Sequence, residues 1–173
     1  MALDDRWRQV HSGFCRALLD DFRATIRYVA FIPDNHRTYS IEYLRLLLDT
    51  CSEIESLAKS LCEEHSRSQL RPNSNINDWR RIIVKHVPAF PSHDVRFQFQ
   101  FSLQPWADWG KTRASNPAWW SAYNSVKHER SRHFHQANQL NVISALCGMS
   151  VFARYLFSWN FFGTLDESWL RVS

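Results

Sequence analysis

The stretch from Trp119 to Arg130, WWSAYNSVKHER, carries the side chains of this chain that are best suited to chemistry. If the stretch is a helix, one stripe is apolar and the opposite stripe holds Trp120, Asn124, Lys127 and His128. An imidazole can move a proton near neutral pH, an ammonium can offset negative charge, and an amide can orient a hydroxyl or phosphate oxygen. This combination favours a phosphodiester as ligand or substrate. The alternative is an ordinary solvated face of an amphipathic helix.

Four of these residues are the catalytic candidates. We expect His128 to act as acid or base, and Lys127 and Arg130 to stabilise phosphate charge. Asn124 would orient the substrate. These roles need the four polar groups to lie on one accessible surface.

Three further residues are candidates for substrate binding: Trp120, Arg132 and His135. Because Trp119 and Trp120 are adjacent, one can enter the core while the other faces outward. Trp120 is then an interface or base-stacking residue, or else a second core contact.

The WWSAYNSVKHER run, with Phe134, Ala137 and the run NVISAL at 141–146, resembles bacterial proteins of the HEPN-like class. Residues 39–59 are similar to the second helix of that group, and the resemblance covers most of residues 40–157. It implies a helical domain of the kind found in toxin–antitoxin, anti-phage and RNA-processing systems. The partners that it implies are RNA or a nucleotide, a second copy in a homodimer, and an antitoxin or another partner protein.

Active members of this class are similar to metal-independent endoribonucleases, in which an Arg and a His from each protomer meet across a dimer cleft. The 2′-hydroxyl of the RNA attacks the adjacent phosphate and leaves a cyclic phosphate end. This chain departs from that pattern, because Asn124 precedes His128 where an Arg is expected. The nearest Arg and His whose separation in the sequence matches that of the family's Arg–His pair are Arg130 and His135. In a continuous helix these two side chains point about 140° apart, so they converge only if the helix breaks near Ser131.

Two candidate centres therefore stay open, one around His128 and one formed by Arg130 and His135. We favour the first, with Arg130 either as a phosphate clamp or as an ion-pair partner for Glu53 or Glu55. A member without the motif Arg can also be a non-catalytic scaffold that dimerises or binds a partner protein or nucleotide.

Two other groups of polar residues have simpler interpretations. His128, His133 and His135 are metal-ligand types, but no cysteine or second spaced pair completes a site, so we expect no metal or cofactor. A basic stretch favours a solvated face over an RNA track; it consists of Arg67, Arg71, Arg80, Arg81 and Lys85.

The composition predicts one globular domain over residues 1–173, with 45% hydrophobic and 22% charged residues. The formal net charge of +4 mildly favours an anionic partner such as RNA. The four cysteines form no CxxC pair, which indicates reduced thiols. We find no segment of signal-peptide type and expect the apolar segment 142–157, which carries Arg154, to be too short for a membrane span. These features predict a cytoplasmic protein without a membrane partner.

Hydrophobic periodicity predicts helices over residues 2–31, 40–64, 79–87, 116–129 and 136–159. Ser40 is the expected cap of the second helix, and Asn116-Pro117 the expected start of the fourth. Strict alternation over residues 95–103 predicts a strand or one arm of a hairpin. The expected fold is all-α, an antiparallel bundle of four or five helices with a short β-hairpin or strand insertion near 94–103.

Overall fold

The computed structural model describes residues 4–66, 68, 70–71, 73–97, 101–157, 161–162 and 170–172. These residues form six α-helices, which are α1 (Asp5–Thr25), α2 (Ile41–Ser66), α3 (Ile76–His86), α4 (Ala118–His128), α5 (Arg130–His133) and α6 (Gln139–Phe157). Short 3-10 turns occur at Pro33–Asn35, Phe90–Ser92, Ala107–Gly110 and Phe134–Gln136. The predicted all-α fold is confirmed.

A small antiparallel sheet accompanies the helices. Its strands are β1 (Val95–Phe97), β2 (Phe101–Leu103), β3 (Phe161–Phe162) and β4 (Leu170–Val172), in the order β2-β1-β4-β3. Val95 pairs with Leu103 on β2 and with Val172 on β4. The hairpin near 94–103 is confirmed, but the alternating segment is not one arm of it: residues 95–103 contain both strands, with residues 98–100 outside the described part. The sequence did not indicate β3 and β4.

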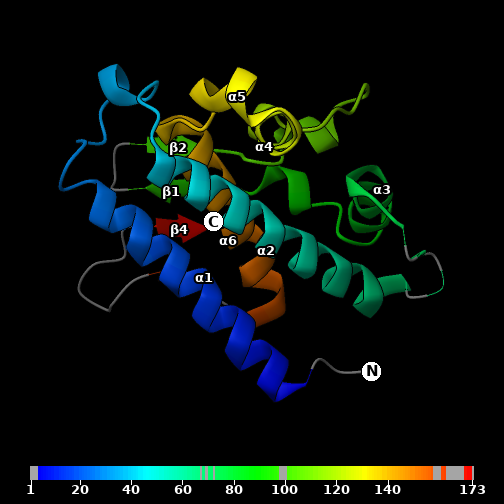
Figure 1. Cartoon of the computed structure of the whole chain (residues 1–173). Helices are drawn as coiled ribbons and strands as arrows, with labels where there is room; N and C mark the ends of the chain where they lie inside the picture. The colour runs from blue at the N-terminus through cyan, green and yellow to red at the C-terminus, as the bar shows by residue number, and fades with distance from the viewer. Residues whose placement is uncertain are drawn as a thin grey trace.

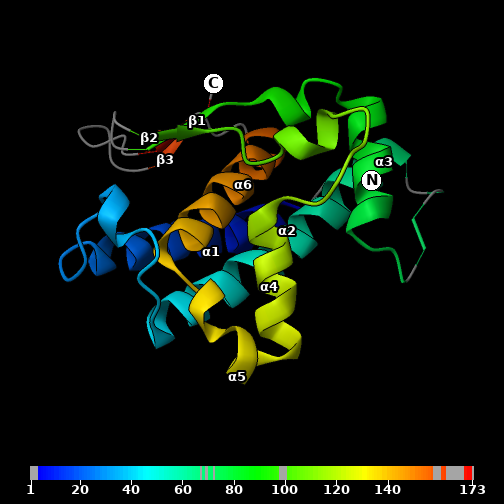
Figure 2. The same cartoon turned by 90° about the horizontal axis from the view of Figure 1, so that it is seen from above.

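The helix α2 lies against α6 over the most extensive helix–helix contact, and α1 packs on both (Figure 1). Seen from above, α6 runs between the α1–α2 pair and the strands (Figure 2). This central position explains the apolar sequence of α6, which has 19 residues and contains an 18-residue stretch with a mean hydropathy of 1.5. Contrary to our expectation, α6 is long and apolar enough to cross a membrane by length and composition alone. However, 67% of it is buried inside the protein, as in a core helix.

Local capping accounts for most of the helix boundaries. The Ser40 hydroxyl accepts a hydrogen bond from the Tyr43 N–H at 3.0 Å, which confirms the predicted cap of α2. Helix α3 begins three residues earlier than predicted, because Asn75 and Asp78 form a capping box. The predicted cap at Asn116 is wrong: Pro117 occupies the N-cap of α4, and no side-chain hydrogen bond caps that helix.

Indole rings fix the start of α4 against α6. Trp119 donates from Nε1 to the Pro105 carbonyl at 3.1 Å, and Trp106 donates to the Gly148 carbonyl at 3.0 Å. A Cβ at Gly148 would lie 2.8 Å from the Trp119 ring, so the absence of a side chain there allows the close approach. The aromatic core therefore holds α4 in place from its first turn.

All four cysteines are free and buried. Burial raises the pKa of each thiol, and raises that of Cys62 to about 12. These thiols are apolar core residues, in agreement with the prediction of reduced cysteines.

Candidate nucleic-acid interface

The polar end of α4 is created by a break in the helix. Glu129 adopts φ −133° and ψ 65°, and its N–H donates to the Ser125 carbonyl at 2.9 Å. The chain then forms the single turn of α5 and the 3-10 turn Phe134–Gln136, which lie above the start of α2 in Figure 1. The helix therefore breaks at Glu129, before both Arg130 and His135, and not near Ser131 between them. Because the chain turns here, α5 lies against α4, and Lys127, His128, Arg130 and Arg132 on either side of the break are exposed.

Trp120 does not reach this corner. Its side chain is 3% exposed, and its ring packs edge to face with those of Trp79, Trp119 and Tyr123, with centroids 5.2–6.4 Å apart. The expected stacking or interface role is therefore wrong, and Trp120 is the second core contact. Helical periodicity placed it opposite Trp119, but α3 covers the face on which it lies.

Lys127 lies at the edge of the core, where a chain of hydrogen bonds holds its side chain. Its Nζ donates to the Tyr123 hydroxyl at 2.8 Å, which donates to Glu55 Oε1 at 3.0 Å. Lys127 Nζ is also 3.7 Å from the same carboxylate oxygen, and its side chain is 47% exposed. Burial, followed by the Glu55 carboxylate, raises the pKa of the Tyr123 hydroxyl. The ammonium is therefore held in place while part of its surface faces solvent.

His128 and Arg130 are exposed, and Asn124 is half-buried. None of these three side chains makes a hydrogen bond or ion pair with another described residue. Arg130 is not the expected partner of Glu53 or Glu55. Glu53 instead bonds His11 Nδ1 at 2.6 Å, and Glu55 bonds Tyr123. His128, Asn124 and Arg130 are thus available to a ligand.

The second candidate centre is less well assembled. Arg130 lies in α5 and His135 in the following 3-10 turn, with the main helix break before both of them. His135 contacts the His133 ring, with centroids 6.4 Å apart, and no described contact joins it to Arg130. Arg132 is exposed and pairs with Glu129 at 3.6 Å. These residues add charge to the corner without forming an acid–base pair.

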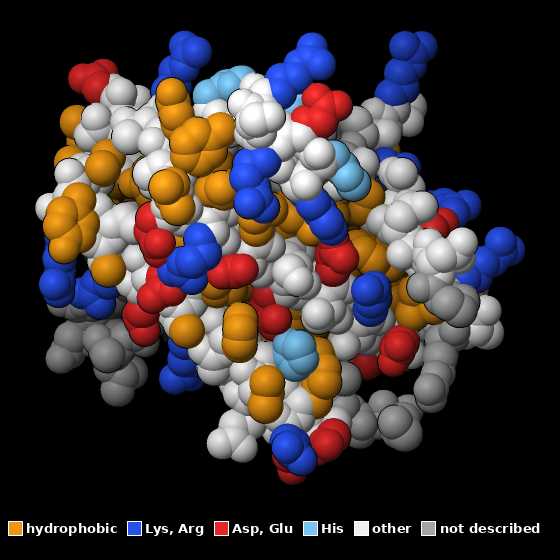
Figure 3. Space-filling view, in the orientation of Figure 1, with side chains coloured by type: hydrophobic (Ala, Val, Ile, Leu, Met, Phe, Trp, Pro, Cys, Tyr) orange, Lys and Arg blue, Asp and Glu red, His pale blue; other side chains and the backbone are white. Residues whose placement is uncertain are grey.

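We call this corner the α4–α5 surface and define it by Asn124, Lys127, His128, Arg130, Arg132 and His135. Glu129 is the single acidic residue between positions 124 and 141, against one lysine, two arginines and three histidines. Figure 3 shows Lys, Arg and His side chains along the top of the molecule, where α5 lies in Figure 1. The surface therefore suits an anion.

Two aromatic residues that sequence analysis did not select flank this surface. Tyr39 is 51% exposed, and its ring lies 5.3 Å from that of Phe134 at 81°. Tyr39 precedes the cap of α2 in an irregular segment, where helical periodicity gives no indication of side-chain direction. The only indication in the sequence that Tyr39 could matter was its position immediately before Ser40, the predicted N-cap of α2.

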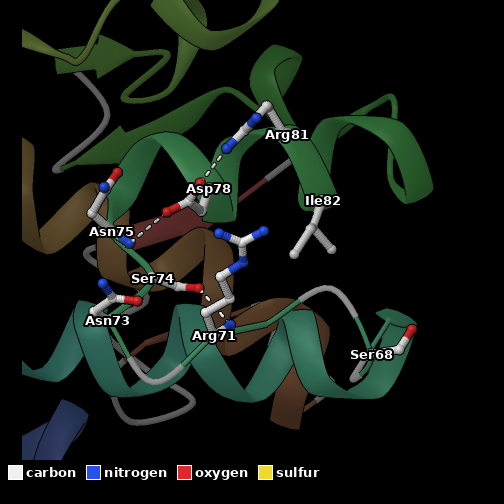
Figure 4. A pocket seen from close by; sticks show the side chains of 8 residues that line it. All are labelled: Ser68, Arg71, Asn73, Ser74, Asn75, Asp78, Arg81 and Ile82. Atoms are coloured by element: carbon white, nitrogen blue, oxygen red, sulfur yellow. Dashed lines mark hydrogen bonds and ion pairs between the residues drawn. The ribbon is translucent and has the colours of Figure 1, made fainter.

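A separate polar hollow of about 590 Å³ lies beside the start of α3 (Figure 4). Asp78 accepts from the Asn75 N–H at 3.0 Å and from the Arg81 guanidinium, as the dashed lines show. The Asn75 N–H, followed by Arg81, lowers the pKa of the Asp78 carboxyl. Asn75 and Asp78 in this hollow therefore serve the cap of α3.

Within the described ranges, no group of three or more His, Cys, Asp or Glu residues could hold a metal ion. No protein-family model, curated protein or solved structure matches this chain. The assignment of a function therefore depends on the chemistry of the α4–α5 surface.

Proposed function

We propose that this chain is a HEPN-like RNA-binding protein whose ligand lies with its phosphate backbone on the α4–α5 surface. The observation that carries the proposal is the exposed turn at Glu129, which presents His128 and Arg130 without protein partners. Phosphate oxygens accept hydrogen bonds from both side-chain types, and Arg can bind phosphate in a bidentate manner.

The balance of charge supports an anionic ligand over a solvated face. A solvated helix face commonly pairs its cations with carboxylates at neighbouring turns. Here, Glu129 faces Arg132 and His133, while Arg130 has no described partner. A polyanion that neutralises such a cation releases condensed counterions, and this release drives binding at low salt.

Metal-independent cleavage is the second candidate function, favoured by His128 and Asn124 lying one turn apart on α4. In this reaction His128 would take the proton of the 2′-hydroxyl. The 2′-oxygen would bond to phosphorus, the bond from phosphorus to the 5′-oxygen would break, and that oxygen would take a proton from water while His128 returns its proton to solvent. Lys127 and Arg130 would stabilise the charge on the phosphate. Among the described residues of one chain, no hydrogen bond or ion pair joins His128 to a second proton-transfer group, so the geometry supports binding more directly.

The test of binding is fluorescence anisotropy with a labelled single-stranded RNA in EDTA over a salt series. We expect wild-type binding to weaken with salt, and Arg130→Gln to reduce the slope of log affinity against log salt by about 0.7. Arg6→Gln removes the same charge from an exposed residue in the first turn of α1 and serves as the matched control. Absence of wild-type binding, or equal effects of the two variants, would overturn the proposal.

The test of cleavage uses the same RNA and buffer. Cyclic phosphate ends that appear with the wild type and not with a folded His128→Ala variant would support a ribonuclease centred on His128. Intact RNA across structured and single-stranded substrates would reject cleavage and favour the non-catalytic scaffold.

A further inference from the structure

The exposed aromatic pair formed by Tyr39 and Phe134 lies beside the α4–α5 surface. The two rings meet edge to face, so each keeps a ring face that its partner does not cover. Tyr39 is half exposed, and Phe134 is half-buried against the core. Leu140 and Ile41 are also exposed nearby in the sequence, at 37% and 79%. The apolar character of this corner therefore reaches solvent.

The backbone that carries Tyr39 is fixed. Tyr39 forms an antiparallel bridge with Asn138, immediately before α6. Gln139 N–H donates to the Thr38 carbonyl at 2.9 Å, and Leu140 N–H donates to the His36 carbonyl at 3.1 Å. A ring on a fixed backbone loses little conformational entropy when a ligand stacks on it. The backbone position of the ring is thus preorganised.

The charge around the pair selects the kind of partner. Arg37 is exposed two residues before Tyr39, and Arg132 is exposed two residues before Phe134. Glu42, the first acidic residue of α2, is already paired with Arg45 at 2.5 Å. An aromatic platform among cations is complementary to an unpaired nucleotide, which offers a flat base and a negative phosphate. An apolar protein partner would gain nothing from these cations.

We propose that Tyr39 and Phe134 form a base-stacking subsite for an unpaired nucleotide of the RNA held on the α4–α5 surface. This inference rests on the proposed RNA binding and assigns a single-stranded segment to it. Tyr39 supplies the stacking face, Phe134 supports the ring, and the neighbouring cations hold the phosphate. The hydroxyl of Tyr39 makes no described hydrogen bond, so the ring alone is needed.

The effect of removing the ring can be estimated. Stacking on an aromatic side chain changes affinity by about 5-fold to 150-fold per base when the side chain is replaced by alanine. We therefore expect Tyr39→Ala to weaken single-strand binding at least about 5-fold, and Tyr39→Phe to bind as the wild type does. Phe14→Ala is the matched control, because Phe14 is 55% exposed on α1.

The experiment measures affinity of the full chain for a 2′-O-methyl oligonucleotide, which cannot be cleaved by 2′-hydroxyl attack. Inorganic polyphosphate, which has the charge but no base, is measured as a competitor. An oligonucleotide containing 2-aminopurine reports stacking directly through quenching of its fluorescence. Light scattering of each variant records the oligomeric state, and circular dichroism confirms folding.

Weaker oligonucleotide binding and lost quenching in Tyr39→Ala, with polyphosphate binding unchanged, would support the subsite. If Tyr39→Ala binds the oligonucleotide as tightly as the wild type does, the subsite is overturned and the proposed RNA binding stays intact. A changed oligomeric state with unchanged RNA affinity would overturn it in favour of contact with a second copy. Absence of any RNA binding by the wild type would overturn the proposed function and the subsite together.

Discussion

Replacing Trp120 with alanine tests whether this side chain stabilises the core or contributes to a surface contact. The sequence alone left both roles open. The Trp120 side chain is 3% exposed and contacts aromatic rings from both α3 and α4. Its loss would leave a cavity between α4 and α3, because neither neighbouring helix can close the space without moving its own rings. We therefore expect a large fall in stability and no direct effect on association.

The magnitude follows from the area of the ring. A buried tryptophan removes up to about 250 Å² from water, and about 25 cal/mol per Å² gives an upper value of about 6 kcal/mol. The methyl group of alanine and the compactness of the unfolded chain reduce this to about 3–5 kcal/mol, the usual range for Trp→Ala in a core. For a chain of this length the melting temperature should fall by about 6–20 °C.

The assay is urea denaturation followed by circular dichroism, together with light scattering of the folded variant. Trp120→Phe keeps a ring and should lose clearly less stability than Trp120→Ala. Tyr39→Ala serves as the surface control and should stay within about 0.5 kcal/mol of the wild type. A loss below about 1 kcal/mol for Trp120→Ala, with weakened self-association, would refute the placement of this ring in the core.

Two further predictions concern the supporting structure. Gly148→Ala should lower the free energy of unfolding by about 1–2 kcal/mol in urea denaturation. The new Cβ would lie 2.8 Å from the Trp119 ring, which is held by its hydrogen bond. The cost of this clash outweighs the gain in helix propensity. Gly13→Ala, with open space around its Cβ, should be neutral or stabilising, and an equal gain at Gly148 would contradict the packing argument. Burial raises the pKa of the Glu53 carboxyl, against the opposing effect of His11, so the folded state holds this proton more tightly than the unfolded chain. The free energy of unfolding of the wild type should therefore fall as the pH rises from 4.5, the ordinary pKa of a Glu carboxyl, through the raised pKa of Glu53. Glu53→Gln has no carboxyl to titrate and should not show this fall. Identical pH profiles of stability for the two proteins would contradict the prediction.

The α4–α5 surface depends on these core contacts. The indole rings fix the first turn of α4, and the Lys127–Tyr123–Glu55 hydrogen bonds fix its last turn against α2. The break at Glu129 then ends α4, and α5 follows directly against it. Core variants that move α4 should therefore weaken ligand binding indirectly, whereas Arg130→Gln should weaken binding while stability is kept.

The sequence by itself determined the local elements and the chemistry available to them. The apolar repeat of α2 and the alternation around β1 and β2 have the periods of a helix and of strands, and these periods are local properties of the chain. The concentration of Lys, Arg and His after Asn124 was likewise visible in the sequence. The cysteine pattern favoured reduced thiols, and all four cysteines are free and buried in the fold.

Only the tertiary structure decided which side chains reach solvent. Trp120 is buried because α3, distant in the sequence, covers that face of α4, and helical periodicity carries no information about such a neighbour. Lys127 is held by Glu55 for the same reason, since α2 packs beside α4. Tyr39 is exposed because its backbone is bridged to Asn138 at the edge of the fold. Burial depends on contacts between segments far apart in the chain, and so the location of the site required the folded structure.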